Sequence, residues 1–391
     1  MIVRKMNIAG GVQRHVLSLA KELTGREHEV IIYTFSFSPE HCYPQMLNTC
    51  KVISLDAMPN IYSRFLPEFL NEYRLARRLA LLIDPHTDVL NPDHATHRVA
   101  YYFKKYVRAI PSVWMMHDIP LRRIARMRMP RTRTKRGRIF RQFLGELLDR
   151  YEINRFIKAQ DYVTVHGNRD RAWVQKYFHK DARVIHSGID PTYFSYRKKQ
   201  PLNKNNIMVL MSGIFLPHRR FEDGIHAVSL LKAQGYHIHL RIIGDYNFDQ
   251  SYYHILKDAV KSQGLTQEIT FSGRVSETEL LNYYHESDIF IFPNHLQSWG
   301  LAVFEAMACG TPVIISRTAG ASEILTDREN ALFINPKAPQ EIAEALRYLV
   351  AHPDAYTRLS AQGRNFVETH LSWKELADTM EKIFKNAVAS R

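Results

Sequence analysis

The chain is poor in cysteine and lacks long apolar runs. Its 391 residues include only three cysteines, Cys42, Cys50 and Cys309, and none of them forms the paired spacing of a metal-binding motif. This scarcity argues against a disulfide framework and fits a reducing cytoplasm. The absence of any apolar run of about eighteen residues argues against a membrane-spanning helix. The residues after Met1 do not have the pattern of a signal peptide, so none is expected.

Acidic residues are also few. The chain has 53 Lys and Arg against 39 Asp and Glu, a net charge of +14, which predicts an anionic partner such as a nucleotide, a phospholipid surface or nucleic acid. No acidic residue occurs between Ile119 and Gly145, and within it the segment 121–141 interleaves Arg and Lys with apolar residues. This segment predicts docking on anionic lipid headgroups at a membrane surface. Nucleic acid is not expected, because no aromatic platform or known module accompanies the charge, and a solvated loop is the remaining alternative.

Apolar runs alternate with amphipathic helical patterns in both halves of the chain, which is typical of α/β proteins with parallel sheets. After a short opening strand that ends at Arg4, the strands expected in the first half are 29–34, 51–55, 88–91, 112–116, 162–166 and 183–186. Those expected in the second half are 207–211, 238–243, 268–271, 289–292, 313–316 and 331–334. The polar segment 196–206 has the composition of a linker. We therefore predict two Rossmann-like domains, 1–195 and 196–371, followed by a final segment, 372–391.

The stretch 293–313 is the most informative part of the sequence. It follows an apolar strand and contains a helix that we predict from Leu301 to Cys309. The glycine and proline that come next end this helix. Gln297 therefore lies on a loop at the carboxyl end of a strand, and Glu305 lies in the next helix. Open α/β sheets bind ligands at such places. A carboxylate there can accept hydrogen bonds from two ribose hydroxyls, and a glycine such as Gly300 lets the chain approach phosphates.

This stretch resembles the signature of the retaining glycosyltransferases of family 4, which have the GT-B fold of two Rossmann-like domains facing across a cleft. The family pattern is Glu, seven residues, a second Glu, then Ala-Met-Ala, a small residue, Gly, a small residue and Pro-Val. Glu305 matches the second Glu, and the match continues to Val313. Gln297 replaces the first Glu, so it retains hydrogen bonding but carries no charge. An ordinary strand–loop–helix unit of another α/β protein is the alternative.

Two further motifs of the second half support the resemblance. The segment 212–223 follows a strand and begins a helix, and in the family an Arg and a Lys of this segment bind the donor diphosphate. Ile214 stands at the family Arg and Arg219 at the family Lys, while Arg220 offers a neighbouring cation. A solvated charge pair is the alternative. A second turn, which includes Arg274 and Val275, matches the one whose backbone meets the nucleobase.

The first half contains two matching loops. Gly10 and Gly11 precede an apolar helical stripe and resemble the family's Gly-Gly-Val-Glu-Arg loop, which faces the phosphates and the acceptor. His117 ends the strand predicted at 112–116, where the family often has a histidine that contacts the transferred sugar. A histidine with a purely structural part is the alternative. The final segment, 372–391, is expected to be a helix that crosses back to the first domain, as in the family.

The resemblance implies a retaining, metal-independent hexosyltransferase that uses a nucleoside diphosphate sugar, needs no cofactor and acts on a glycan or lipid-linked acceptor. The residues expected to act in catalysis are His117, Gln297, Arg219 and Arg220, and those expected to bind the donor are Glu305, Gly10, Gly11, Arg274, Val275, Gly300 and Leu301. No residue is expected to bind a metal. We expect a cytoplasmic protein with peripheral contact to the inner face of the membrane. A nucleotide-sugar epimerase of similar fold and a non-catalytic sugar-binding protein remain alternatives.

Overall fold

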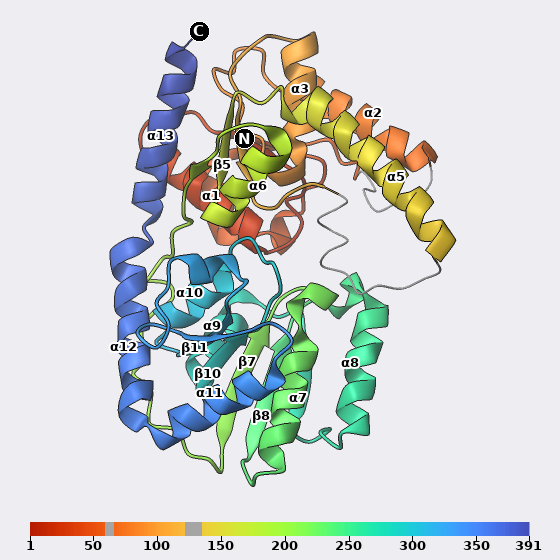
Figure 1. Ribbon diagram of the computed structural model, residues 1–391. Helices are drawn as coiled ribbons and strands as arrows, with labels where there is room; N and C mark the ends of the chain where they lie inside the picture. The colour runs from red at the N-terminus through yellow and green to blue at the C-terminus, as the bar shows by residue number, and fades with distance from the viewer. Residues whose placement is uncertain (59–65, 122–134, 391) are drawn as a thin grey trace. The chain divides into compact units, whose positions relative to one another are not determined.

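The computed structural model describes residues 1–58, 66–121 and 135–390, which form two compact units (Figure 1). Unit 1 contains the chain up to Gly188 together with the C-terminal stretch that begins at Trp373. Unit 2 contains Ile189–Ser372. The sequence places the first boundary after residue 195, and the structure divides the chain between Gly188 and Ile189.

Unit 2 is a doubly wound parallel sheet. Its strands are β7 (Ile207–Ser212), β8 (Ile238–Ile243), β9 (Ile269–Gly273), β10 (Ile289–Phe292), β11 (Val313–Ser316) and β12 (Leu332–Ile334). Its longer helices are α7 (Phe221–Lys232), α8 (Gln250–Ser262), α9 (Glu277–Glu286), α10 (Leu301–Ala308), α11 (Pro339–Ala351) and α12 (Pro353–His370). The strand order is β12-β11-β10-β7-β8-β9, and every neighbouring pair is parallel. The winding direction therefore reverses between β7 and β10.

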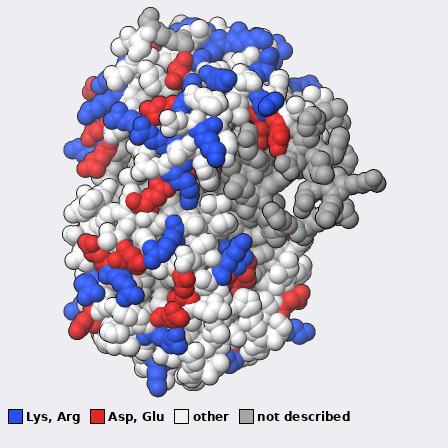
Figure 2. Space-filling model, viewed as in Figure 1, with Lys and Arg blue, Asp and Glu red and all other residues white. Residues whose placement is uncertain are grey.

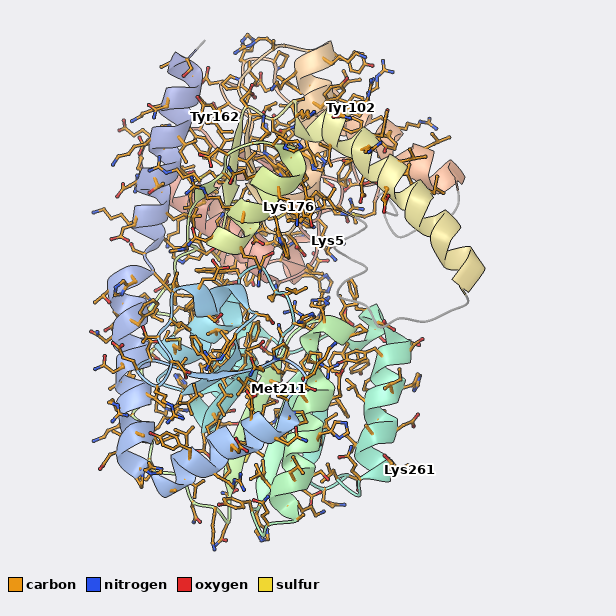
Figure 3. All side chains as sticks on the ribbon, in the orientation of Figure 1. Lys5, Tyr102, Tyr162, Lys176, Met211 and Lys261 are labelled. Carbon is orange, nitrogen blue, oxygen red and sulfur yellow. The ribbon has the colours of Figure 1, made fainter. Side chains whose placement is uncertain are left out.

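Side chains of β10 alternate between two hydrophobic cores, one on each face of this sheet. Ile289 and Ile291 join the core formed with α7, α8 and α11, whereas Phe290 and Phe292 join the core formed with α9, α10 and α12. This is the pattern of a parallel strand buried on both faces. Met211 of β7, labelled in Figure 3, packs so closely against Gly224 of α7 that a Cβ there would collide with its sulfur.

Unit 1 contains two sets of parallel strands. One set is β1 (Ile2–Val3), β2 (Ile31–Thr34) and β3 (Lys51–Ser54), and the other is β4 (Val113–Met116), β5 (Tyr162–Val165) and β6 (Arg183–Val184). Single bridges at Leu90, Pro92 and Asp93 lie between the sets. The segment predicted as a strand at 88–91 therefore takes part in single bridges and does not form a regular strand of its own.

The helices of unit 1 are α1 (Gly11–Thr24), α2 (Leu66–Leu82), α3 (His97–Tyr106), α5 (Lys135–Glu152), α6 (Asn168–Phe178) and α13 (Trp373–Ala389). The last helix follows unit 2 in the sequence but packs in unit 1. Leu19 and Leu23 of α1 share a buried core with Leu376, Met380 and Ile383 of α13. None of the helices in the part of the chain that the structure describes is long and apolar enough to cross a membrane.

A buried ion network joins α2, α3 and the end of α5. The guanidinium of Arg98 donates to both carboxylate oxygens of Glu152 at 2.8 and 2.7 Å and pairs with Glu72 at 2.6 Å. The Nε2 atom of His97 lies 2.6 Å from the same carboxylate. Burial alone would raise the pKa of Glu152, but the charge of Arg98 and the hydrogen bond from His97 outweigh it and lower the pKa to about 2.

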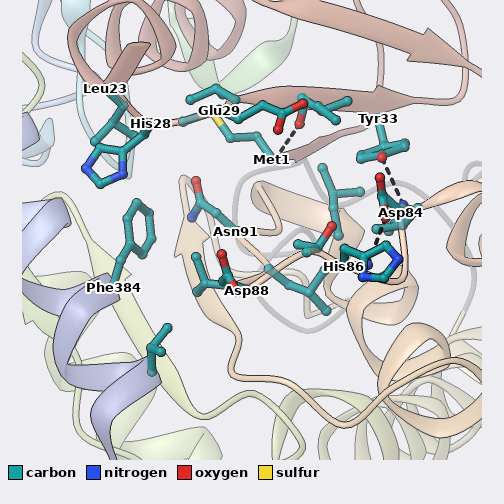
Figure 4. A pocket seen from close by; sticks show the side chains of 18 of the residues that line it. Met1, Leu23, His28, Glu29, Tyr33, Asp84, His86, Asp88, Asn91 and Phe384 are labelled. Atoms are coloured by element: carbon teal, nitrogen blue, oxygen red, sulfur yellow. Dashed lines mark hydrogen bonds between the residues drawn. The ribbon is translucent and has the colours of Figure 1, made fainter. Parts of the chain in front are cut away.

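A pocket of about 530 Å³ lies in unit 1 beside the start of β2 (Figure 4). Its lining includes Met1 and Asn91, Tyr33 of β2 and Phe384 of α13. Ligands of doubly wound sheets bind at the carboxyl ends of strands, whereas β2 begins beside this pocket. We therefore assign the pocket no part in the site.

Candidate functional site

Two loops of unit 2 meet at the carboxyl ends of β7 and β10, where the winding direction reverses. Segment 213–220 follows β7, and segment 293–300 follows β10. The backbone N–H of His295 donates to the carbonyl of His218 at 2.7 Å, which joins the two loops directly. A reversal point of this kind is the place where an open α/β sheet binds ligands.

Arg219 is held in this place by Asn294. With its amide oriented to satisfy both groups, Asn294 donates to the carbonyl oxygen of Arg219 at 3.1 Å and accepts from Arg219 Nη1 at 2.7 Å. Asn294 is buried, so these two bonds fix the direction of the guanidinium against a rigid support. Asn294 lies inside the stretch that carries the family signature, yet the sequence offered no reason to single it out.

Arg220 lies beside Arg219 but is engaged differently. Its guanidinium donates to Asp223 at 3.0 and 2.5 Å and pairs with Glu222 at 2.5 Å. Asp223 in turn accepts from the backbone N–H of Lys337 at 3.0 Å. The structure thus brings Arg220 to the predicted loop but balances its charge with two carboxylates of the first turn of α7.

Glu305 lies in α10, and its carboxylate is oriented by a tyrosine. The hydroxyl of Tyr284, in α9, donates to Glu305 Oε2 at 3.0 Å. Glu305 is 5% exposed. Burial, and then the charge of Glu305, raise the pKa of Tyr284 well above its ordinary value, so this hydroxyl keeps its proton and remains a donor. Tyr284 was missed in the sequence because a tyrosine on the apolar face of a helix usually indicates only core packing.

A third loop, after β11, supports the segment that contains Gln297. The carbonyl oxygen of Gln297 accepts from the backbone N–H of Gly320 at 2.7 Å. A Cβ at Gly320 would collide with the carbonyl of Ser298, so only glycine permits this approach. Gly300 has a φ of +130° and precedes Leu301, the first residue of α10. The side chain of Gln297 is half-buried at this edge.

The predicted base-binding turn lies at the end of β9. The carbonyl of Gly273 accepts from the N–H of Gly244 at 2.9 Å, which joins the ends of β8 and β9. The side chain of Arg274 is exposed and lies 3.3 Å from Asp245, while Val275 packs against the core beside α9 and α10.

The predicted residues of unit 1 lie at the start of α1 and the end of β4. Gly10 precedes Gly11, the first residue of α1, and its carbonyl accepts from the N–H of Arg14 at 2.9 Å. The amide of Gln13 donates to the carbonyl of Lys5 at 2.8 Å and so supports this loop. His117 follows β4, and its two ring nitrogens face other side chains of unit 1.

The basic segment predicted at 121–141 lies mostly outside the described residues. Leu121 is buried, residues 122–134 are not described, and of 135–141 only the backbone of α5 is described. The structure therefore does not test the membrane prediction at this segment.

Two family models match the chain one after the other. The model described as Glycosyltransferase Family 4 matches residues 9–193, and the model described as Glycosyl transferases group 1 matches residues 193–366. The chain is a family 4-like glycosyltransferase. The Gly-Gly loop and His117 lie in the first matched region, and Arg219, Gln297 and Glu305 lie in the second.

Relatives and solved structures agree with this assignment. An uncharacterized glycosyltransferase of Methanocaldococcus jannaschii is 23% identical over 97% of this glycosyltransferase and 95% of its own length. The sucrose-phosphate synthase of Thermosynechococcus elongatus superposes with a TM-score of 0.79 at 18% identity, covering 100% of this chain and 98% of that one. The Anabaena protein HepE, solved with UDP and glucose, superposes with a TM-score of 0.72 at 14% identity, covering 99% and 100%. The fold is therefore GT-B, as the sequence predicts.

Proposed function

We propose that this glycosyltransferase moves a sugar from a nucleoside diphosphate sugar to a glycan or lipid-linked acceptor, with retention at the anomeric carbon and without a metal. The observation that carries the proposal is the supported pair at the reversal point of unit 2, Arg219 held by Asn294 and Glu305 held by Tyr284. A guanidinium suits the diphosphate, and a fixed carboxylate suits the ribose hydroxyls. Uridine is the base we favour, because the similar Anabaena structure contains UDP.

In this proposal the reaction depends on stabilising the leaving diphosphate. Arg219 neutralises the negative charge that develops there, a task for which a preoriented cation is suited because it need not reorganise during the reaction. Gln297 hydrogen-bonds the donor sugar, and the leaving phosphate itself takes the proton of the acceptor hydroxyl. Arg220 supports the loop through its carboxylate partners, and His117 lies near the transferred sugar, as the family resemblance implies.

Nucleotide binding tests the ribose assignment. The variant Glu305→Gln keeps the volume of the side chain and an acceptor for Tyr284 but loses the charge. Because a hydrogen bond to a charged group contributes about 1.5–3 kcal/mol, we expect the Kd for UDP, measured by calorimetry, to rise about tenfold or more. Glu329→Gln, at an exposed glutamate of the same unit, is the matched control and should bind like the wild type. Equal affinity in all three proteins would contradict the role of Glu305.

Product analysis tests the reaction class. The wild-type protein is incubated with UDP-sugars and candidate acceptors, and the anomeric configuration of the product is read by proton NMR. A glycoside with the donor's configuration is expected. An inverted product would refute retention, and conversion of the donor sugar without an acceptor would favour the epimerase instead.

We further propose that unit 1 contacts an anionic membrane that carries a lipid-linked acceptor. Besides the basic segment, α2 presents exposed Leu70 and Leu81 at 58% and 56% exposure, with exposed Arg74 and Arg77 between them in the sequence. Figure 2 shows Lys and Arg side chains gathered near the upper edge of the viewed face. Apolar insertion combined with positive charge is the usual basis of reversible peripheral binding.

Cosedimentation with vesicles tests this contact. Binding to anionic vesicles should exceed binding to neutral ones and should weaken with salt, because the screening length falls from about 10 Å at 0.1 M to about 3 Å at 1 M. The double variant Arg74→Gln, Arg77→Gln should bind less than the matched double variant Lys257→Gln, Lys261→Gln on α8 of unit 2. Equal binding to neutral and anionic vesicles, or no binding to either, would remove the membrane from the proposal.

A further inference from the structure

Several histidines of unit 1 gather around the carboxyl end of β4. The ring centroid of His117 lies 4.9 Å from that of His15 and 4.9 Å from that of His166. The rings come from different parts of the chain, since His15 lies in α1 and His166 follows β5. Across the described ranges, no group of three or more His, Cys, Asp and Glu side chains has the arrangement of a metal site. The cluster therefore calls for an explanation in terms of hydrogen bonds and protons.

A chain of three hydrogen bonds runs through the cluster. His117 Nε2 lies 2.7 Å from Asp93 Oδ2, and His117 Nδ1 lies 2.8 Å from His166 Nε2. His166 Nδ1 lies 3.2 Å from the carbonyl oxygen of Ile185. The two ends of this chain, a carboxylate and a carbonyl, can only accept hydrogen bonds. Both ring nitrogens of His117 are thus engaged within unit 1.

The chain needs one more proton than two neutral imidazoles carry. Each of the three hydrogen bonds requires one hydrogen, whereas two neutral rings have only two between them. If His166 donates from Nδ1 to Ile185, a neutral His166 must accept at Nε2. His117 must then donate from both of its nitrogens, which makes it an imidazolium cation beside the carboxylate of Asp93.

The surroundings favour His117 as the place for this charge. Burial, and then the charge of His117, lower the pKa of His166 well below its ordinary value. The same two causes lower the pKa of His15. The side chains of Asp93 and His117 are only 4% and 10% exposed, so water does little to weaken their attraction. His15 is held separately, with Nδ1 2.9 Å from Ser187 Oγ.

Other titratable groups surround the cluster. His94 lies close enough to His117 and to Asp118 to interact electrostatically with both, and Arg4 adds a positive charge near His94. His186 acts on His166 in the same way. Among the described contacts, Asp93 is the one carboxylate that hydrogen-bonds directly to the His117 ring.

We propose that Asp93 is a positioning residue that keeps His117 doubly protonated, so that unit 1 holds one fixed imidazolium cation at the carboxyl end of β4. Its effect on the reaction rests on the proposed function, which places His117 near the transferred sugar. Because both N–H groups of His117 are engaged, the ring acts through its charge, which stabilises negative charge developing on the leaving diphosphate.

Nitrogen NMR of imidazole-labelled protein tests the proton count. Near neutral pH the wild type should show two protonated nitrogens on His117, with the signals assigned by their loss in His117→Gln. In Asp93→Asn one of these nitrogens should lose its proton, whereas Asp84→Asn, an exposed carboxylate that precedes the same segment, should match the wild type. A neutral His117 in the wild type, or an unchanged His117 in a folded Asp93→Asn, would overturn the proposal. The wild-type spectrum alone decides the proton count if Asp93→Asn does not fold.

The pH profile of turnover tests the part that Asp93 has in the reaction. Asp93→Asn should lower kcat by about tenfold or more, as expected for a lost charged hydrogen bond, and should recover activity as the pH falls and His117 regains its proton. UDP binding should weaken as well, because UDP carries the negative charge that the imidazolium stabilises. A profile that is unchanged in Asp93→Asn would overturn the positioning role. If the wild type shows no transfer with any donor, the proposed function fails, and the NMR experiment still decides the charge of His117.

Discussion

The buried network around Glu152 should make unit 1 sensitive to acid. Glu152 accepts from Arg98 and His97, and its pKa is lowered from 4.5 to about 2. A carboxyl group whose pKa is lower in the folded state than in the unfolded chain stabilises the fold above the unfolded value. This stabilisation is therefore fully present above pH 4.5 and is lost as the pH falls towards about 2.

The size of this stabilisation follows from the same two pKa values of Glu152. At about 1.4 kcal/mol for each pH unit, the difference between a pKa of 4.5 and one of about 2 corresponds to about 3–4 kcal/mol of unfolding free energy. Glu152 is almost completely buried, so solvent screening reduces this figure little. Breaking a buried ion pair by removing one partner typically costs about 3–5 kcal/mol, which agrees with it. We expect Glu152→Gln to destabilise the protein by about 3 kcal/mol at neutral pH.

Urea unfolding at several pH values measures this effect. Fluorescence is a suitable signal because Trp114 lies 4.9 Å from His97 in the network. The gap in unfolding free energy between the wild type and Glu152→Gln should narrow as the pH falls below 4.5, while Glu146→Gln, at an exposed position of α5, should follow the wild type throughout. A gap that stays constant with pH would refute the reasoning, because the lost stability would then not depend on ionisation of Glu152.

Further predictions concern the loops of unit 2. Gln297→Ala should lower kcat strongly while calorimetric UDP binding stays near normal, and a fully active variant would exclude a catalytic part for this side chain. Asn294→Ala should weaken UDP binding by about tenfold, the effect of a lost charged hydrogen bond, because Arg219 loses its support, and unchanged affinity would show that Arg219 is held by other contacts. Gly320→Ala should lower the melting temperature and weaken UDP binding together, since its Cβ would collide with the carbonyl of Ser298; wild-type melting and affinity would show that the loops can adjust.

The strands of unit 2 could be predicted closely because they are buried on both faces. Continuous apolar runs bounded by turn residues gave β10 and β11 the bounds Ile289–Phe292 and Val313–Ser316 that the structure has. The spacing of Ser276 and Glu279 in the sequence is that of a capping box, and the structure has its two reciprocal bonds at 3.2 and 2.8 Å. These signals are local, so they need no knowledge of the rest of the fold.

The supports of the candidate site could not be predicted, because they join residues that are distant in the sequence. Asp93 meets His117 across 24 positions, and Tyr284 meets Glu305 across 21. Neither pair has a spacing that a single helix or strand would reveal. The ion pair between Arg220 and Asp223 is different, because residues three positions apart at the start of a helix are neighbours in space. The spacing of this pair is therefore visible in the sequence.

The packing of α13 in unit 1 has a consequence for the order in which the protein is made. Unit 1 is discontinuous, because its last helix is synthesised only after all of unit 2. During translation Leu19 and Leu23 must wait for Leu376, Met380 and Ile383 before their shared core can close. Unit 2 is continuous and can complete its own sheet first. The nascent first unit therefore keeps this apolar face open until the C-terminal helix has been made.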